Sequence, residues 1–227
     1  VLTIALAISL IVLARLASRW QRARRDAFIR TAPLPKGLFE RLRKRRPGLS
    51  DKECQLVARG LRQFFLCYLH GGRRPVSMPS QVVDDLWHEF ILYTRNYDEW
   101  CRKAFGRFLH HTPAVVLGPQ RQGNTGLRRC WWQACREENI NPRQATRLPL
   151  LFALDAKLGI ADGYHYKADC SALRRGSGDR PVHCGGDFSS TSFDGGTDGF
   201  GDGAGDGGGS DGGSDGGGCS GGGCGGD

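Results

Sequence analysis

The chain has 227 residues and a formal net charge of +9, which leaves room for one domain of ordinary size with appendages. From residue 182 to the end there are eight aspartates and no lysine or arginine, so the remainder carries about +17 by subtraction. This asymmetry excludes a uniformly charged protein: a strongly basic body is joined to an acidic tail.

The chain begins with an apolar segment. Residues 1–14 carry no charge, and Leu16 and Ala17 extend the apolar run past Arg15. Seventeen helical residues span about 26 Å, close to the roughly 30 Å of a bilayer's hydrocarbon core. Trp20 suits the headgroup level. We predict a transmembrane anchor over residues 1–20; a cleaved signal peptide and a buried helix are the alternatives.

Two basic clusters follow the apolar segment. The first cluster lies within and directly after the anchor. By the positive-inside rule it predicts that the chain crosses the bacterial inner membrane once and that the rest of the chain lies in the cytoplasm. Residues 21–37 are then a basic juxtamembrane linker. Both clusters are expected to attract anionic lipid, whereas nucleic acid is unlikely to be the partner because no nucleic-acid-binding motif accompanies the charge. They comprise Arg15, Arg19, Arg22, Arg24 and Arg25, then Lys36, Arg41, Arg43, Lys44, Arg45 and Arg46.

Residues 38–170 read as a helical domain. Ser50 and Glu53 form a capping box that opens a helix ending at Gly71 and Gly72. No stretch alternates with a period of two for long enough to predict a sheet. The expected fold class is therefore all-α: a transmembrane helix, a helical bundle and a disordered glycine-rich tail.

The aromatic-rich segment 78–111 is the one around which we expect the domain to be organised. Pro79 suits the first turn of a helix, and Asn96 with Glu99 has the form of a capping pair. The first helix is therefore predicted to end near Thr94 and a second to begin at Tyr97.

Asp84 and His88 are four residues apart and share a helical face. A bend at Asn96 would bring Cys101 toward them, with His110 or His111 folding back. The metal hypothesis takes Asp84, His88, Cys101 and His110 as the set, with zinc as the candidate ion. The simpler interpretation is a core histidine hydrogen-bonded to Asp84 and a small buried thiol.

Six residues of this segment resemble a known pattern. Asp84, Trp87, His88, Tyr97, Cys101 and Gly106 are similar in identity and spacing to the D-x-x-W-H…Y-x-x-x-C…G pattern of the glycine-rich domain-containing protein-like family. Phe90 stands where the plant pattern usually has a second histidine. The resemblance implies a helical domain, and it brings no established reaction with it.

Further helices are predicted after an exposed loop over residues 118–124. Asn124 is expected to cap a helix, and Asn141 before Pro142 and Pro149 mark two more helix starts, with Gly159 closing the last. In a reducing cytoplasm the cysteines of this domain are expected to be buried thiols. A second possible zinc set consists of His165, Cys170, His183 and Cys184, but the spacing of these residues does not match that of established zinc sites.

Residues 171–227 form a glycine- and aspartate-rich tail with Cys219 and Cys224 near its end. It has too few apolar residues to offset the entropy of ordering its glycines, which predicts disorder. The sequence thus favours a membrane-anchored helical interaction module with an unknown protein partner, no established cofactor and no assigned catalytic residue. The alternative is a metal-binding protein or metal-dependent enzyme.

Overall fold

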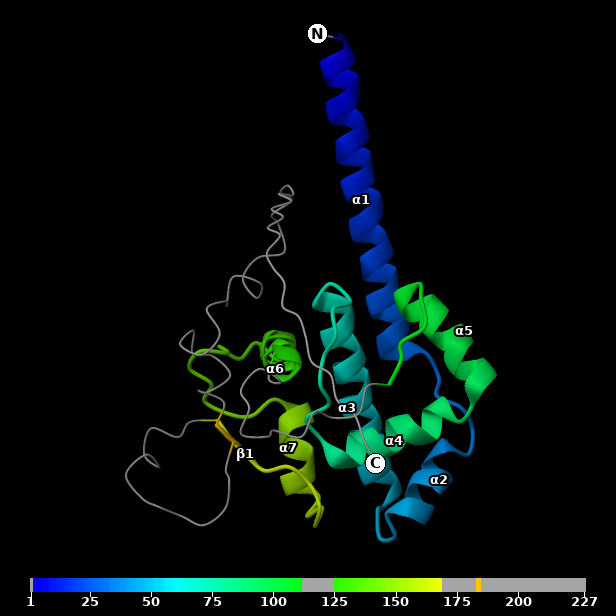
Figure 1. The fold of residues 1–227 in the computed structure, drawn as a ribbon, viewed down its shortest axis with the longest axis vertical. Helices are drawn as coiled ribbons and strands as arrows, with labels where there is room; N and C mark the ends of the chain where they lie inside the picture. Colours follow the sequence, from blue (N-terminus) through cyan, green and yellow to red (C-terminus); the bar gives the residue numbers. More distant parts are fainter. Residues whose placement is uncertain (1, 112–124, 169–182, 185–227) are drawn as a thin grey trace, which may run out of the picture.

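We describe the fold from a computed structural model, which describes residues 2–111, 125–168 and 183–184 (Figure 1). The described residues form seven helices and almost no strand, which confirms the predicted fold class. A two-residue parallel ladder joins Tyr166 to His183 and Lys167 to Cys184. The elements are α1 (Leu2–Thr31), α2 (Leu38–Arg45), α3 (Asp51–His70), α4 (Gln81–Ile91), α5 (Thr94–Phe105), α6 (Thr125–Glu137), α7 (Leu150–Lys157), β1 (Tyr166–Lys167) and β2 (His183–Cys184).

Helix α3 lies at the centre of the domain and contacts α1, α2, α4, α6 and α7. Its first turn has the predicted capping box, in which Ser50 and Glu53 satisfy each other's backbone N–H groups. Where α7 crosses, a side chain at Gly60 would collide with Leu154, so glycine permits this close approach. The segment 78–111 packs around α3, which is therefore the organising helix of the described domain.

Helix α1 is continuous from Leu2 to Thr31, so residues 21–31 of the predicted linker are helical. It is long and apolar enough to cross a membrane, and its most apolar window is not buried by the rest of the protein. Its last two turns are docked instead: Ile29 is fully buried, Phe28 packs on Trp100, and the Arg62 guanidinium donates to the Ala32 carbonyl at 2.6 Å. Figure 1 shows the remainder of α1 projecting from the domain.

The turn between α4 and α5 differs from the prediction. Helix α4 begins after Ser80, whose hydroxyl accepts from the Val83 N–H, so Pro79 precedes the helix. The chain breaks at Leu92 and Tyr93, and α5 already starts at Thr94. The capping assignment of Asn96 is wrong, because Asn96 lies inside α5.

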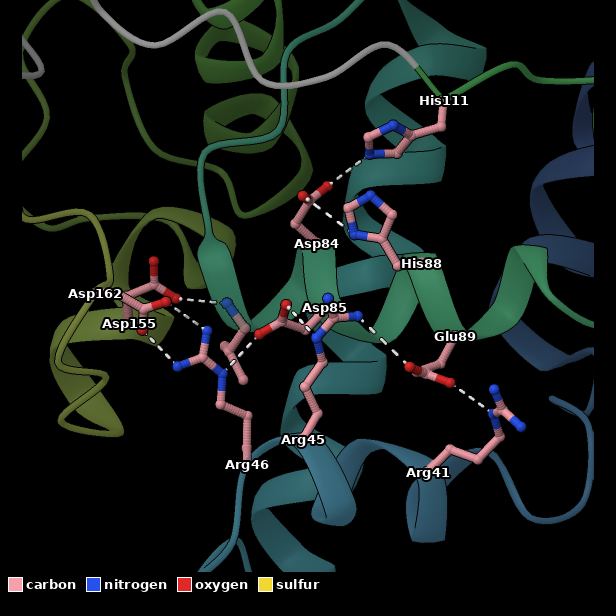
Figure 2. A network of polar contacts seen from close by, with 11 residues as sticks. Arg41, Arg45, Arg46, Asp84, Asp85, His88, Glu89, His111, Asp155 and Asp162 are labelled. Atoms are coloured by element: carbon pink, nitrogen blue, oxygen red, sulfur yellow. Dashed lines mark hydrogen bonds and ion pairs between the residues drawn. The ribbon is translucent and has the colours of Figure 1, made fainter.

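The second basic cluster is largely neutralised inside the domain. Arg41 pairs with Glu89 at 2.5 Å, and Arg46 pairs with Asp85 at 2.6 Å. Arg45 contacts both of these carboxylates, and Arg43 pairs with Asp51. These ion pairs join α2 and the residue after it to α4 and to the start of α3, so four arginines expected to face lipid have carboxylate partners in the domain. Figure 2 shows the pairs of Arg41, Arg45 and Arg46.

The second half of the domain is built from α6 and α7. Pro149 precedes α7 as predicted, whereas Asn141 and Pro142 form a turn and the helix predicted there is wrong. Glu138 accepts from the Leu150 N–H at 2.5 Å and so caps α7. Among the described residues, five cysteines are free and buried, as expected for thiols: Cys54, Cys67, Cys101, Cys130 and Cys135.

The loop over residues 118–124, the cap at Asn124, Cys170, and residues 171–182 and 185–227 of the predicted tail lie outside the described residues.

Candidate functional site

Asp84, His88 and His111 form a cluster on the surface of α4 (Figure 2). The Nε2 atom of His111 lies 3.0 Å from Asp84 Oδ1, and His88 Nδ1 lies 3.4 Å from Asp84 Oδ2. One ligand atom from each residue can be chosen so that all three lie within 4.8 Å of one another. A carboxylate and two imidazoles therefore converge on one small volume.

The His88 imidazole is not satisfied by this carboxylate. Its Nδ1 atom is buried, lacks hydrogen-bond geometry to Asp84, and has no hydrogen-bond partner among the described residues. The His88 side chain as a whole is 40% exposed. Buried polar atoms are normally hydrogen-bonded or coordinated, so this nitrogen is a candidate metal ligand.

Trp87 and Tyr97 place His111 over the cluster. The indole N–H of Trp87 donates to the Tyr97 hydroxyl at 3.0 Å, and that hydroxyl donates to the Leu109 carbonyl at 2.7 Å. The Trp87 ring also packs against the His111 imidazole, with centroids 4.6 Å apart. The segment after α5 is thus tied to α4 at two points.

Gly106 turns the chain from α5 into this segment. It follows the last residue of α5 with a φ of 76°, in the left-handed region that favours glycine. The Arg25 guanidinium lies where a side chain at this position would be, but it is the end of a flexible side chain, so the backbone conformation is what favours glycine here. The chain can therefore reverse immediately and return His111 to α4.

Cys101 and His110 lie outside the cluster. Cys101 is fully buried beside Tyr97 and Leu109, and burial raises the pKa of its thiol, although hydrogen bonding with the Leu109 backbone and Tyr97 acts in the opposite direction. His110 is exposed and packs on Phe108. Of the hypothesised metal set, the structure brings together Asp84 and His88, and it adds His111.

Two buried carboxylates hold α4 in place beneath the cluster. Asp155 of α7 accepts from the Ser80 hydroxyl and from the N–H groups of Gln81, Val82 and Tyr164, at 2.7 to 3.2 Å. It therefore caps α4, where the helix dipole favours a negative charge. At the next turn Asp85, only 3% exposed, pairs with Arg46 of the α2–α3 connection.

A family model matches residues 24–188, which include the whole domain and all three residues of the cluster. The chain belongs to the UCP032817-like family. This family is uncharacterised and brings no activity to the cluster. No curated protein and no solved structure matches the chain.

The cluster of this UCP032817-like domain has the donor set of an open metal site. Two histidines and one carboxylate, with positions left for other ligands, occur in catalytic zinc sites and in non-haem iron sites. Closed structural zinc sites instead have four protein ligands. Nitrogen and oxygen donors without sulfur select divalent transition metals over Cu(I).

His111 was the alternative to His110 in the sequence, and the burial pattern of its neighbours distinguishes them. Leu109 is buried, His110 is exposed and His111 is half-buried. In an extended segment, residues two apart point to the same side. Leu109 is the aliphatic residue of this stretch, so taking it as the buried position would have selected His111.

Proposed function

We propose that the chain is a membrane-anchored helical protein that binds a divalent transition-metal ion through Asp84, His88 and His111. The convergence of two imidazoles on one carboxylate, with His88 Nδ1 buried and lacking a hydrogen bond, supports this proposal. Asp84 and His88 would supply two ligands, and Trp87, Tyr97, Cys101 and Gly106 would position the third ligand, His111.

The roles of the three residues follow from their surroundings. Asp84 is largely buried and contacts both imidazoles, whose ring centroids are 4.2 Å apart, so its carboxylate would bind the ion beside the two rings. His88 is exposed at its outer edge, which leaves room for water or a small anionic ligand on the ion. The ion would lower the pKa of such a water, as it does in metal-dependent hydrolases.

Metal analysis of the purified full chain, loaded with zinc, iron(II), manganese or cobalt and then desalted, tests the site. We expect about one equivalent of one of these metals in the wild type. Asp84→Asn and His111→Gln should weaken binding at least about tenfold. His110→Gln is the matched control and should retain the metal. Equal retention by His110→Gln and His111→Gln would refute the assignment, and so would the absence of bound metal from the wild type.

The anchor is the second part of the proposal. The exposed apolar surface of α1, including Ile4, Leu10 and Leu13 at more than half exposure, supports a membrane span rather than a core helix. With the arginines that follow, it favours a single pass of a bacterial inner membrane with the domain in the cytoplasm. Resistance to alkaline carbonate tests the span. An impermeant maleimide that reaches Cys219 and Cys224 only after permeabilisation would support the orientation.

Without a bound ion, the cluster is a contact between α4 and the segment after α5. The domain would then be an interaction module held at the membrane, with a protein partner still to be found. A wild-type chain that retains no metal in the metal analysis would favour this second function.

A further inference from the structure

Six arginines lie on the second half of α1 or in the loops that follow α3 and α5, and they differ from the arginines of α2 and of the α2–α3 connection. Among the described residues, no carboxylate lies within ion-pair distance of any of the six, whereas Arg41, Arg43, Arg45 and Arg46 each pair with one. We call this group the arginine collar. It consists of Arg22, Arg24, Arg25, Arg73, Arg74 and Arg107; all are exposed except Arg25, which is partly buried.

The centre of the collar is a tight group at the end of α5. Arg73 donates to the Phe105 carbonyl at 3.0 Å, Arg107 donates to the Arg73 carbonyl, and the Arg25 guanidinium lies against Gly106. The carboxyl end of a helix carries only about half a negative charge. Three guanidinium groups therefore leave most of their positive charge unbalanced, and the charges of Arg25 and Arg73 repel each other.

The position of the collar along α1 matches a lipid headgroup layer. Arg25 is five positions after Trp20, which is about 7.5 Å along a helix. The headgroup region of one leaflet is about 5 to 8 Å thick. If Trp20 lies at the edge of the hydrocarbon core, Arg25 and its neighbours from α3 and α5 lie among the headgroups. Figure 1 shows α1 emerging beside these two helices.

We propose that the arginine collar binds the phosphate groups of anionic lipids and so holds the domain directly on the membrane surface. The proposal rests on the proposed anchor. It adds to the juxtamembrane arginines of α1 three residues that are distant in the sequence, Arg73, Arg74 and Arg107, which lie in loops. It also removes the paired arginines of α2 from that role.

The test uses the full chain in nanodiscs containing equal amounts of phosphatidylcholine and phosphatidylglycerol, with the lipids retained after gentle extraction counted by native mass spectrometry. We expect enrichment of phosphatidylglycerol in the wild type. A surface arginine contributes about a fivefold preference for anionic lipid, so R73Q/R74Q/R107Q should lower the retained ratio at least fivefold. R22Q/R74Q, which removes no side-chain hydrogen bond, should lower it even if the triple variant folds poorly.

The matched control is K52Q/R95Q/K157Q, which removes three exposed charges. Two of them lie in the first turns of α3 and α5, whereas the collar residues follow the last turns of these helices. It should change the ratio less than about twofold. A wild type that resists carbonate but shows no enrichment would overturn the collar and leave the anchor intact; extraction by carbonate would overturn both. Enrichment only after deletion of residues 185–227 would show that the acidic tail occupies the collar, and would also overturn the proposal.

Discussion

The Tyr97 hydroxyl donates to the Leu109 carbonyl at 2.7 Å, and this bond ties the segment that bears His111 to α5. The same hydroxyl accepts from the buried indole N–H of Trp87. Tyr97→Phe should therefore leave two buried polar groups without a partner and lower the free energy of unfolding by about 1 to 3 kcal/mol. It should also weaken metal binding, because His111 is no longer held over Asp84.

Tyr93→Phe is the matched control for this substitution. The Tyr93 hydroxyl donates to the Lys36 carbonyl at 3.2 Å in an exposed position. Its loss should change the free energy of unfolding by less than about 1 kcal/mol and leave metal affinity unchanged. Denaturant unfolding and metal titration of both variants provide the comparison. If both variants bound metal equally well, the tether would have no role in positioning His111.

Asp155→Ala should be among the most destabilising substitutions in the described domain. The Asp155 carboxylate, which is 1% exposed, accepts from the Ser80 hydroxyl and three backbone N–H groups. Its removal should cost about 3 kcal/mol or more of unfolding free energy. Asp162→Ala, which removes an exposed partner of Arg46, should cost less than about 1 kcal/mol. Similar losses from the two substitutions would contradict this assignment.

Glu138→Gln should remove a pH-dependent part of the stability. Burial raises the pKa of Glu138, but hydrogen bonds from Leu150, Gln63 and Arg147 outweigh it, so the net pKa lies below its ordinary value of 4.5. The carboxylate therefore stabilises the fold above pH 4.5, and this contribution is lost as pH falls through the lowered pKa. Unfolding curves at several pH values should show wild type and variant converging in acid. A constant difference between them would contradict the role of the charge.

Four buried cysteines should be unreactive in the folded chain. Burial raises the pKa of the thiols of Cys54, Cys67 and Cys101, and raises that of Cys135 to about 12. These four should resist iodoacetamide at about pH 8, because the thiolate is the reacting form. After unfolding in urea without reductant, all nine cysteines should react, as counted by intact mass. Rapid modification of Cys67 in the native protein, or a disulfide, would contradict the buried-thiol interpretation.

Local sequence signals predicted the features of the fold that depend on local chemistry. The capping box of Ser50 and Glu53 forms as expected, and Pro149 precedes α7. The signal from Asn96 and Glu99 failed because the chain turns earlier, at Leu92 and Tyr93. The Tyr97 N–H already donates to the Tyr93 carbonyl at 2.8 Å, so α5 is under way before Asn96 could cap it.

Part of the site was also predictable from local spacing in the sequence. Asp84 and His88 lie on one helix, so their proximity follows from helical spacing. The position of His111 depends on contacts between Trp87, Tyr97 and Leu109, which come from three different segments. Such contacts have no fixed spacing in the sequence. The paired state of the α2 arginines was hidden likewise, because their partners come from α4 and from the start of α3.

The ligand shell of the bound metal tests the central claim most directly. X-ray absorption at the metal edge of the loaded full chain should show nitrogen and oxygen neighbours at about 2.0 to 2.2 Å, including two imidazoles. Loss of one imidazole is expected in His111→Gln but not in His110→Gln. A sulfur neighbour at about 2.3 Å, or an unchanged spectrum in His111→Gln, would contradict the site formed by Asp84, His88 and His111.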